Sequence, residues 1–269
     1  MSTFSGTDPT VVGPVTFPRV LQAEWIKLWS LRSTYWTLLG TLTVVVLIAV
    51  LLGVASVVDQ AAGPDGRMTI AMGYTFAQVV VAVLGVLTIT GEYATGMIRS
   101  TLTAVPTRLP ALAAKALLVA VVSFAVGVLG VALAYVASYP LLGSNAASLG
   151  DPEVLRIFWG TGLYLSGVAL LGLGVGAIIR HTAGAITLVL GVLLLLSTLW
   201  QLLMATSDWF TRTYPYLPST AGERIVAPTA TAVTDGPPAL APWAGFGVFA
   251  LYVLLTLILA ATLLQRRDA

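Results

Sequence analysis

Residues 91–115 read GEYATGMIRSTLTAVPTRLPALAAK, and they stand between two long apolar runs, residues 70–90 and 116–139. One charge at the centre of a bilayer costs roughly 2.5–3.5 kcal/mol on insertion scales. Four charged side chains fall in this stretch: Glu92, Arg99, Arg108 and Lys115. We therefore expect the stretch to lie at or outside the membrane surface, on the side that its three cations dictate.

The composition is that of an integral membrane protein. Of 269 residues, 58% are hydrophobic and 9% charged, whereas a soluble domain carries about 25% charged residues. A helix needs about 20 apolar residues to cross roughly 30 Å of hydrocarbon. Six uncharged runs reach that length: residues 35–58, 70–90, 116–139, 157–179, 185–205 and 243–264. The sequence predicts an all-α polytopic membrane protein with six transmembrane helices, since a barrel would show short alternating segments.

The cations predict the topology. With the N-terminus inside, the inner segments carry nine cations: Arg19, Lys27, Arg32, Arg99, Arg108, Lys115, Arg180, Arg266 and Arg267. The outer segments then carry four: Arg67, Arg156, Arg212 and Arg224. Positive charge prefers the cytoplasmic side, so we expect both termini in the cytoplasm and the chain in the plasma membrane as a multi-pass protein.

The N-terminal part divides into a tail and a helix. Residues 1–18 are rich in Thr, Gly and Pro and predict a flexible cytoplasmic tail. From Arg19 to Ser33 we expect an amphipathic helix. Its apolar face holds Leu21, Trp25, Leu28 and Trp29, and its polar face Arg19, Lys27 and Ser30. Trp25, Lys27 and Trp29 suit an interfacial helix in the headgroup layer; the alternative is a plain cationic flank that fixes orientation.

Two further segments carry structural predictions. The segment 206–242 is long for a loop without structure and contains several aromatic residues, so we expect short interfacial helices there. Gly172 and Gly176 are four residues apart in a predicted span, a spacing that permits close approach of a second helix.

The chain lacks the residues of most catalytic and cofactor sites. It has no cysteine, and the one histidine, His181, has no set of partners for zinc. Its two lysines, Lys27 and Lys115, do not follow the glycine loop that cradles nucleotide phosphates. A net charge of +2 without a basic tract argues against nucleic acid. We expect no enzyme activity, cofactor or metal, and the uncharged spans give poor support to ion coupling.

Several motifs in order make the chain resemble a type-2 ABC transporter permease of the actinobacterial kind. The resemblance covers residues 19–269. It rests on AEWIKL at 23–28, RSTYW at 32–36, GEY at 91–93 with Gly96 and Arg99, PTR at 106–108, and GVGAIIR at 174–180.

The resemblance implies a function and partners. Residues 19–33 would form the connecting helix, and Glu92 to about Leu112 a coupling helix seated in a separate ATP-binding subunit, which would bind the ATP. Contacts with that subunit would involve Glu92, Tyr93, Gly96, Arg99 and Arg108. Residues 206–242 would supply outer re-entrant helices. Two copies, or one copy with a related permease, would pair with two ATP-binding subunits to export a substrate. Gly96-Met97 replaces the usual Gly-Thr of that helix.

Two other functions fit the same sequence. The chain could be a membrane scaffold or sensor that binds a cytoplasmic protein without transport. It could also be an intramembrane enzyme, although Ser166 has no histidine beside it within the predicted span.

Overall fold

The computed structural model describes residues 16–58, 65–105, 107–229 and 239–266, and every regular element within these ranges is a helix. Six helical stretches are long and apolar enough to cross a membrane. The predicted all-α, six-span fold is therefore confirmed, and the chain is a membrane-embedded, multi-pass protein.

The spans coincide with the predicted runs but mostly extend beyond them. They are α2 (Arg32–Val58), α3 (Gly66–Ala71) with α4 (Tyr74–Thr95), α6 (Leu109–Leu142), α7 (Pro152–Ile179), α8 (Thr182–Leu190) with a π-helical turn η2 (Gly191–Leu195) and α9 (Leu196–Leu203), and α12 (Pro242–Arg266). A short 3₁₀ turn, η1 (Gly143–Asn145), follows α6. Helical hydrogen bonding continues into the charged flanks, so Glu92 and Lys115 lie inside α4 and α6.

Helix α7 forms the centre of the bundle and packs against α4, α6 and α12. Glycines allow its backbone to approach α4. A Cβ atom at Gly172 would lie 2.6 Å from the carbonyl oxygen of Ala82, and one at Gly176 would lie 2.9 Å from the side chain of Ile89. The predicted close packing at these two glycines is thus confirmed. The fifth span, by contrast, leaves most of its surface uncovered.

Caps at the span ends follow from local sequence. The Asp151 carboxylate accepts the Glu153 N–H at 2.9 Å and begins α7, with Pro152 at its first position. His181 begins α8 by accepting the N–H of Gly184 at 3.2 Å. The lone histidine is therefore the N-cap residue of α8.

The segment between α9 and α12 forms short helices, as predicted, in its described part. These are α10 (Asp208–Thr213), the 3₁₀ turn η3 (Tyr214–Tyr216) and α11 (Pro218–Glu223). Helix α11 packs against α12, and a Cβ atom at Gly222 would lie 2.7 Å from the Tyr164 ring of α7. The Arg156 guanidinium fixes the chain that follows by donating to the carbonyl oxygens of Arg224 (3.1 Å), Ile225 (2.9 Å) and Ala227 (3.0 Å).

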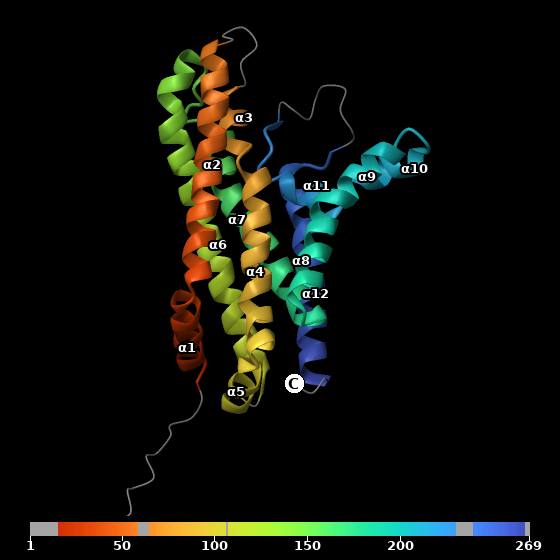
Figure 1. Ribbon diagram of the computed structural model, residues 1–269. Coiled ribbons are helices and arrows are strands. Elements are labelled where there is room, and N and C mark those ends of the chain that lie inside the picture. Colours follow the sequence, from red (N-terminus) through yellow and green to blue (C-terminus); the bar gives the residue numbers. More distant parts are fainter. Residues whose placement is uncertain (1–15, 59–64, 106, 230–238, 267–269) are drawn as a thin grey trace, which may run out of the picture.

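The N-terminal helix α1 (Phe17–Ser30) packs against α6 and α2. Most of the predicted flexible tail lies outside the described residues, but Phe17 and Pro18 already belong to α1. Figure 1 shows α1, α5 (Met97–Ala104) and the C-terminal end of the chain at the same end of the bundle.

Candidate functional site

Helix α1 turns one narrow face to the bundle. Its buried positions are Val20, Glu24 and Leu28, which are four residues apart and so share one face. Trp25 is 45% exposed, and Trp29 is half-buried and stacks edge-on against it. Lys27, predicted on the polar face, is partly exposed, and its ammonium contacts carboxylates of the bundle.

The segment predicted to form one coupling helix is divided among the end of α4, the helix α5 and the start of α6. Glu92 belongs to the last turn of α4, which ends where Gly96 adopts a φ of +72°. Helix α5 follows, and α6 begins at Leu109 after Arg108, whose φ is +58°. Pro106 lies outside the described residues. A single surface helix from Glu92 to Leu112 is therefore wrong, since glycine and the backbone turn at Arg108 interrupt it.

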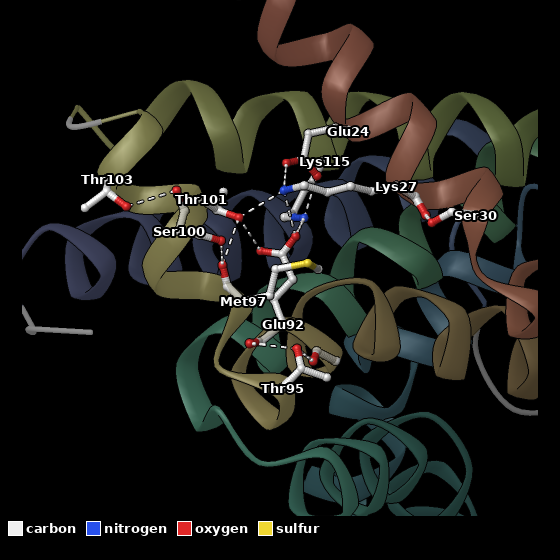
Figure 2. Close-up of polar contacts among 11 residues, drawn as sticks. Glu24, Lys27, Ser30, Glu92, Thr95, Met97, Ser100, Thr101, Thr103 and Lys115 are labelled. Atoms are coloured by element: carbon white, nitrogen blue, oxygen red, sulfur yellow. Dashed lines mark hydrogen bonds and ion pairs between the residues drawn. The ribbon is translucent and has the colours of Figure 1, made fainter. Parts of the chain in front are cut away.

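Two lysines and two glutamates from three helices meet where α1, α4 and α6 converge (Figure 2). The Lys115 ammonium lies 2.5 Å from the Glu24 carboxylate and 2.6 Å from that of Glu92. The Lys27 ammonium lies 2.8 Å from Glu24 and 3.1 Å from Glu92. It also donates to the Thr101 hydroxyl at 2.9 Å, which ties α5 to the same group. We call Glu24, Lys27, Glu92 and Lys115 the charge network.

Burial makes the pairing in this network obligatory. Glu24, Glu92 and Lys115 are 4%, 3% and 4% exposed, and only Lys27 retains substantial access to solvent. An isolated charge in a low-dielectric interior costs several kcal/mol, whereas a charge with hydrogen-bonded partners of opposite sign is tolerated. Two acids and two bases leave no net charge. Lys115 is therefore held inside the protein by its two carboxylate partners.

The pKa of Lys27, the fourth member of the charge network, depends on both glutamates. Its burial alone would lower the pKa of the ammonium, but hydrogen bonds and charge attraction from Glu24 and Glu92 raise the pKa above its ordinary value of 10.5. Lys27 is therefore a permanent cation at neutral pH.

The other predicted contact residues lie apart from the charge network. The half-buried ring of Tyr93 lies 5.2 Å from the Arg180 guanidinium. Arg108 donates to the Leu264 carbonyl oxygen at 2.9 Å and so connects the start of α6 to the end of α12. Gly96 and Arg99 are exposed, Arg99 on the outer side of α5. Of the eight predicted site residues, Glu92 and Lys27 meet in the charge network, and Trp25 and Trp29 contact each other on α1.

Sequence reasoning missed Glu24, Thr101 and Lys115 as partners in one site. A signal was available. Glu24 and Lys27 are three residues apart on a helix, and Glu24 interrupts an otherwise apolar face. An acid on such a face needs a cation from elsewhere, and Lys115 at the start of an apolar run was one of few available.

A second polar site lies near the other end of the bundle, at Glu223 of α11. Its carboxylate is hydrogen-bonded to the Tyr74 hydroxyl and the Gln78 amide of α4. The Tyr164 hydroxyl of α7 donates to the Gln78 carbonyl oxygen at 2.6 Å. Burial raises the pKa of Glu223 to about 7, against the opposing effect of those two hydrogen bonds. This carboxyl therefore titrates near neutral pH.

Neither site has the groups of a metal centre: the described part of the chain contains no cluster of three or more His, Cys, Asp or Glu side chains that could hold an ion. The Ser166 hydroxyl donates to the Ala120 carbonyl oxygen at 2.8 Å and joins α7 to α6. No protein-family model and no curated protein matches the chain.

Loss of one charge from the network should destabilise the protein more than loss of a balanced pair. Lys115→Met leaves two buried carboxylates facing Lys27 alone, at an expected cost of about 3–5 kcal/mol in unfolding free energy. Lys115→Met with Glu24→Gln restores neutrality and should recover part of that loss. Thermal unfolding in detergent, followed by tryptophan fluorescence, measures the three proteins.

Arg99→Met is the matched control, because it removes an exposed cation at the same end and should change stability by less than about 0.5 kcal/mol. A double variant no more stable than Lys115→Met would contradict a neutral, coupled network.

Docking of α11 should weaken as pH rises. A pKa of about 7 in the docked state, against 4.5 when exposed, means that docking favours the protonated carboxyl. Docking is then firmest below pH 4.5 and weakens up to about pH 7. The chain has no cysteine, so Ser219→Cys reports opening of α11 through its reaction with a maleimide. Between pH 5.5 and 8 its rate should rise roughly 25-fold relative to an exposed Tyr216→Cys.

Adding Glu223→Gln should abolish that relative increase, because the amide does not ionise. An equal pH response with and without Glu223→Gln would show that another group controls the docking of α11.

Proposed function

We propose that this chain is the membrane-spanning permease subunit of an ATP-driven ABC exporter in the plasma membrane. ATP is bound and hydrolysed by a separate subunit on the cytoplasmic side. A second permease, either another copy or a related chain, completes the path for the substrate. The chain itself then acts by conformational change and carries out no catalysis.

The observation that carries this proposal is the connection of α5 to the charge network. Helix α5 has eight residues and turns Ile98 and Thr101 inward, while Arg99, Ser100 and Thr103 remain exposed. Thr101 contacts both Lys27 and the Glu92 carboxylate, at 2.9 and 3.3 Å. A force on the exposed face of α5 therefore reaches α1, α4 and α6 through short polar contacts.

Charge and topology support the same proposal. By the order of the spans, nine of thirteen cations fall on the side that carries α1, α5 and the C-terminal end of α12, which the positive-inside rule assigns to the cytoplasm. An ATP-binding subunit would meet α5 on that side. The chain's own described residues contain no carboxylate in the inner half of the bundle that lacks a cation partner. The charge network therefore offers no unpaired carboxylate for ion coupling.

The fifth span is compatible with a second permease. Its surface is largely uncovered, and Leu188, Leu195, Leu199 and Leu202 are among its exposed side chains. Such a face suits either lipid or another membrane helix.

Reversal of charge on α5 should separate the permease from its ATPase. The tagged chain is purified from membranes that also contain the candidate ATP-binding subunit, and the captured subunit and its ATP hydrolysis are measured. Arg99→Glu should reduce capture at least about tenfold, since like charges at an interface cost several kcal/mol. Arg212→Glu, an exposed cation in α10 near the opposite end, is the control and should capture the subunit normally.

If Arg99→Glu captures the ATP-binding subunit normally, α5 is not part of the contact between the two subunits. If the ATP-binding subunit is captured but hydrolyses ATP at the same rate with and without the permease, the result would support the scaffold or sensor function instead.

A further inference from the structure

A cavity of about 430 Å³ lies beside the charge network, between α1, α4 and α6. Its walls are mainly aliphatic and include Leu31, Leu87, Leu118 and Val119. Ser30 and Thr95 lie on its lining near the ends of α1 and α4. The volume is within the range of about 300–1,000 Å³ that small-molecule sites occupy.

The cavity has a local cause in the sequence. Gly91 of α4 lines it, and a Cβ atom built on Gly91 would meet no atom within 4 Å. Farther along the bundle α4 packs closely on α2, where a Cβ atom at Gly73 would lie 2.8 Å from Val45. Helix α1 packs on α6 and α2. Space therefore remains between α1 and the last turns of α4.

With the end of α4 taken as the membrane surface, the cavity lies at the depth of the boundary between headgroups and acyl chains. Residues 87–91 precede the end of α4 at Thr95 by four to eight positions. At 1.5 Å per residue, this places them roughly 6–12 Å inside the helix end. An amphipathic occupant of the membrane surface buries its apolar part about 5–10 Å into the same layer.

The charge of the lining decides the chemistry of the occupant. Glu24, Glu92 and Lys115 are buried and paired with one another, so they offer no net charge to a ligand. The Lys27 ammonium has its donors directed at Glu24, Glu92 and Thr101. What remains open is an aliphatic surface, which favours a hydrocarbon chain over an ionic ligand.

We propose that this cavity binds one acyl chain of a phospholipid from the cytoplasmic leaflet. The chain lies along Leu87, Leu118 and Val119, with its headgroup toward Ser30 and Thr95. An occupant here separates α1 from the end of α4 and adjoins all four members of the charge network. The lipid is thus a structural component of the element that we propose moves with α5. The proposed lipid binding depends on the six-span fold and on the cytoplasmic orientation of the end that carries α1 and α5. It does not depend on transport.

The test uses a variant that fills the cavity without displacing any neighbour. Gly91→Leu places its side chain in open space and replaces glycine with a better helix former, so the variant should fold. Gly247→Leu is the control, because a Cβ atom on this exposed glycine of α12 also meets nothing within 4 Å and lines no part of the cavity. Equal or higher thermal midpoints than wild type establish that both variants are folded.

The probe is a phosphatidylethanolamine with a diazirine in the middle of one acyl chain, added to phosphatidylethanolamine and phosphatidylglycerol vesicles that contain the protein. After illumination, labelled residues are identified by mass spectrometry. Val119 is 1% exposed, so a bulk lipid chain reaches it only through the cavity. We expect label on residues 118–119 and 87–91 in wild type and Gly247→Leu, and at least a fivefold loss in Gly91→Leu.

Label confined to outward-facing residues of wild type would overturn the proposal. Retention of label at Val119 in Gly91→Leu would do the same. Because vesicles need no ATP-binding subunit, these outcomes are independent of whether the proposed transport function is correct.

Discussion

The need to neutralise buried charge organises the end of the bundle that carries α1 and α5, which we call the inner end. Glu24, Glu92 and Lys115 are nearly inaccessible to solvent, and each would be costly to bury alone. Their pairing requires α1 to dock on α6, α4 to continue past its apolar run, and α6 to begin before its own. Thr101 then attaches α5 to the same group. A helix that is short and exposed thereby becomes part of the rigid bundle.

Buried polar groups are stabilised differently at the two ends of the bundle. At the inner end, charges of opposite sign cancel within a compact group. Near the outer end, Arg67 pairs with Asp151 and Glu153, at 2.5 and 2.9 Å, while Arg156 binds Glu153 and several backbone carbonyl groups. Glu223 instead relies on neutral hydrogen-bond donors, and its pKa rises to about 7. Ion pairing therefore satisfies the buried charges at the inner end, whereas the carboxyl of Glu223 depends on its protonation.

The features that the sequence predicted depend on local pattern. Six apolar runs predicted the spans, and the spacing of Gly172 and Gly176 predicted close helix packing. The charge network depends on residues far apart in the chain, such as Glu24 and Lys115. Their pairing reversed the local inference that charges next to a span belong at the surface. The positive φ at Arg108, which separates α5 from α6, likewise has no local signal in a residue other than glycine.

The central claim is that the charge network holds α1, α4, α5 and α6 as one unit, and hydrogen exchange tests it most directly. Amide exchange in α1 and α5 is compared between wild type and Lys115→Met in lipid nanodiscs. If the network holds these helices together, protection is lost in α1 and α5 together while α7 and α12 keep theirs. If the amides of α1 are as well protected in Lys115→Met as in wild type, the claim is contradicted.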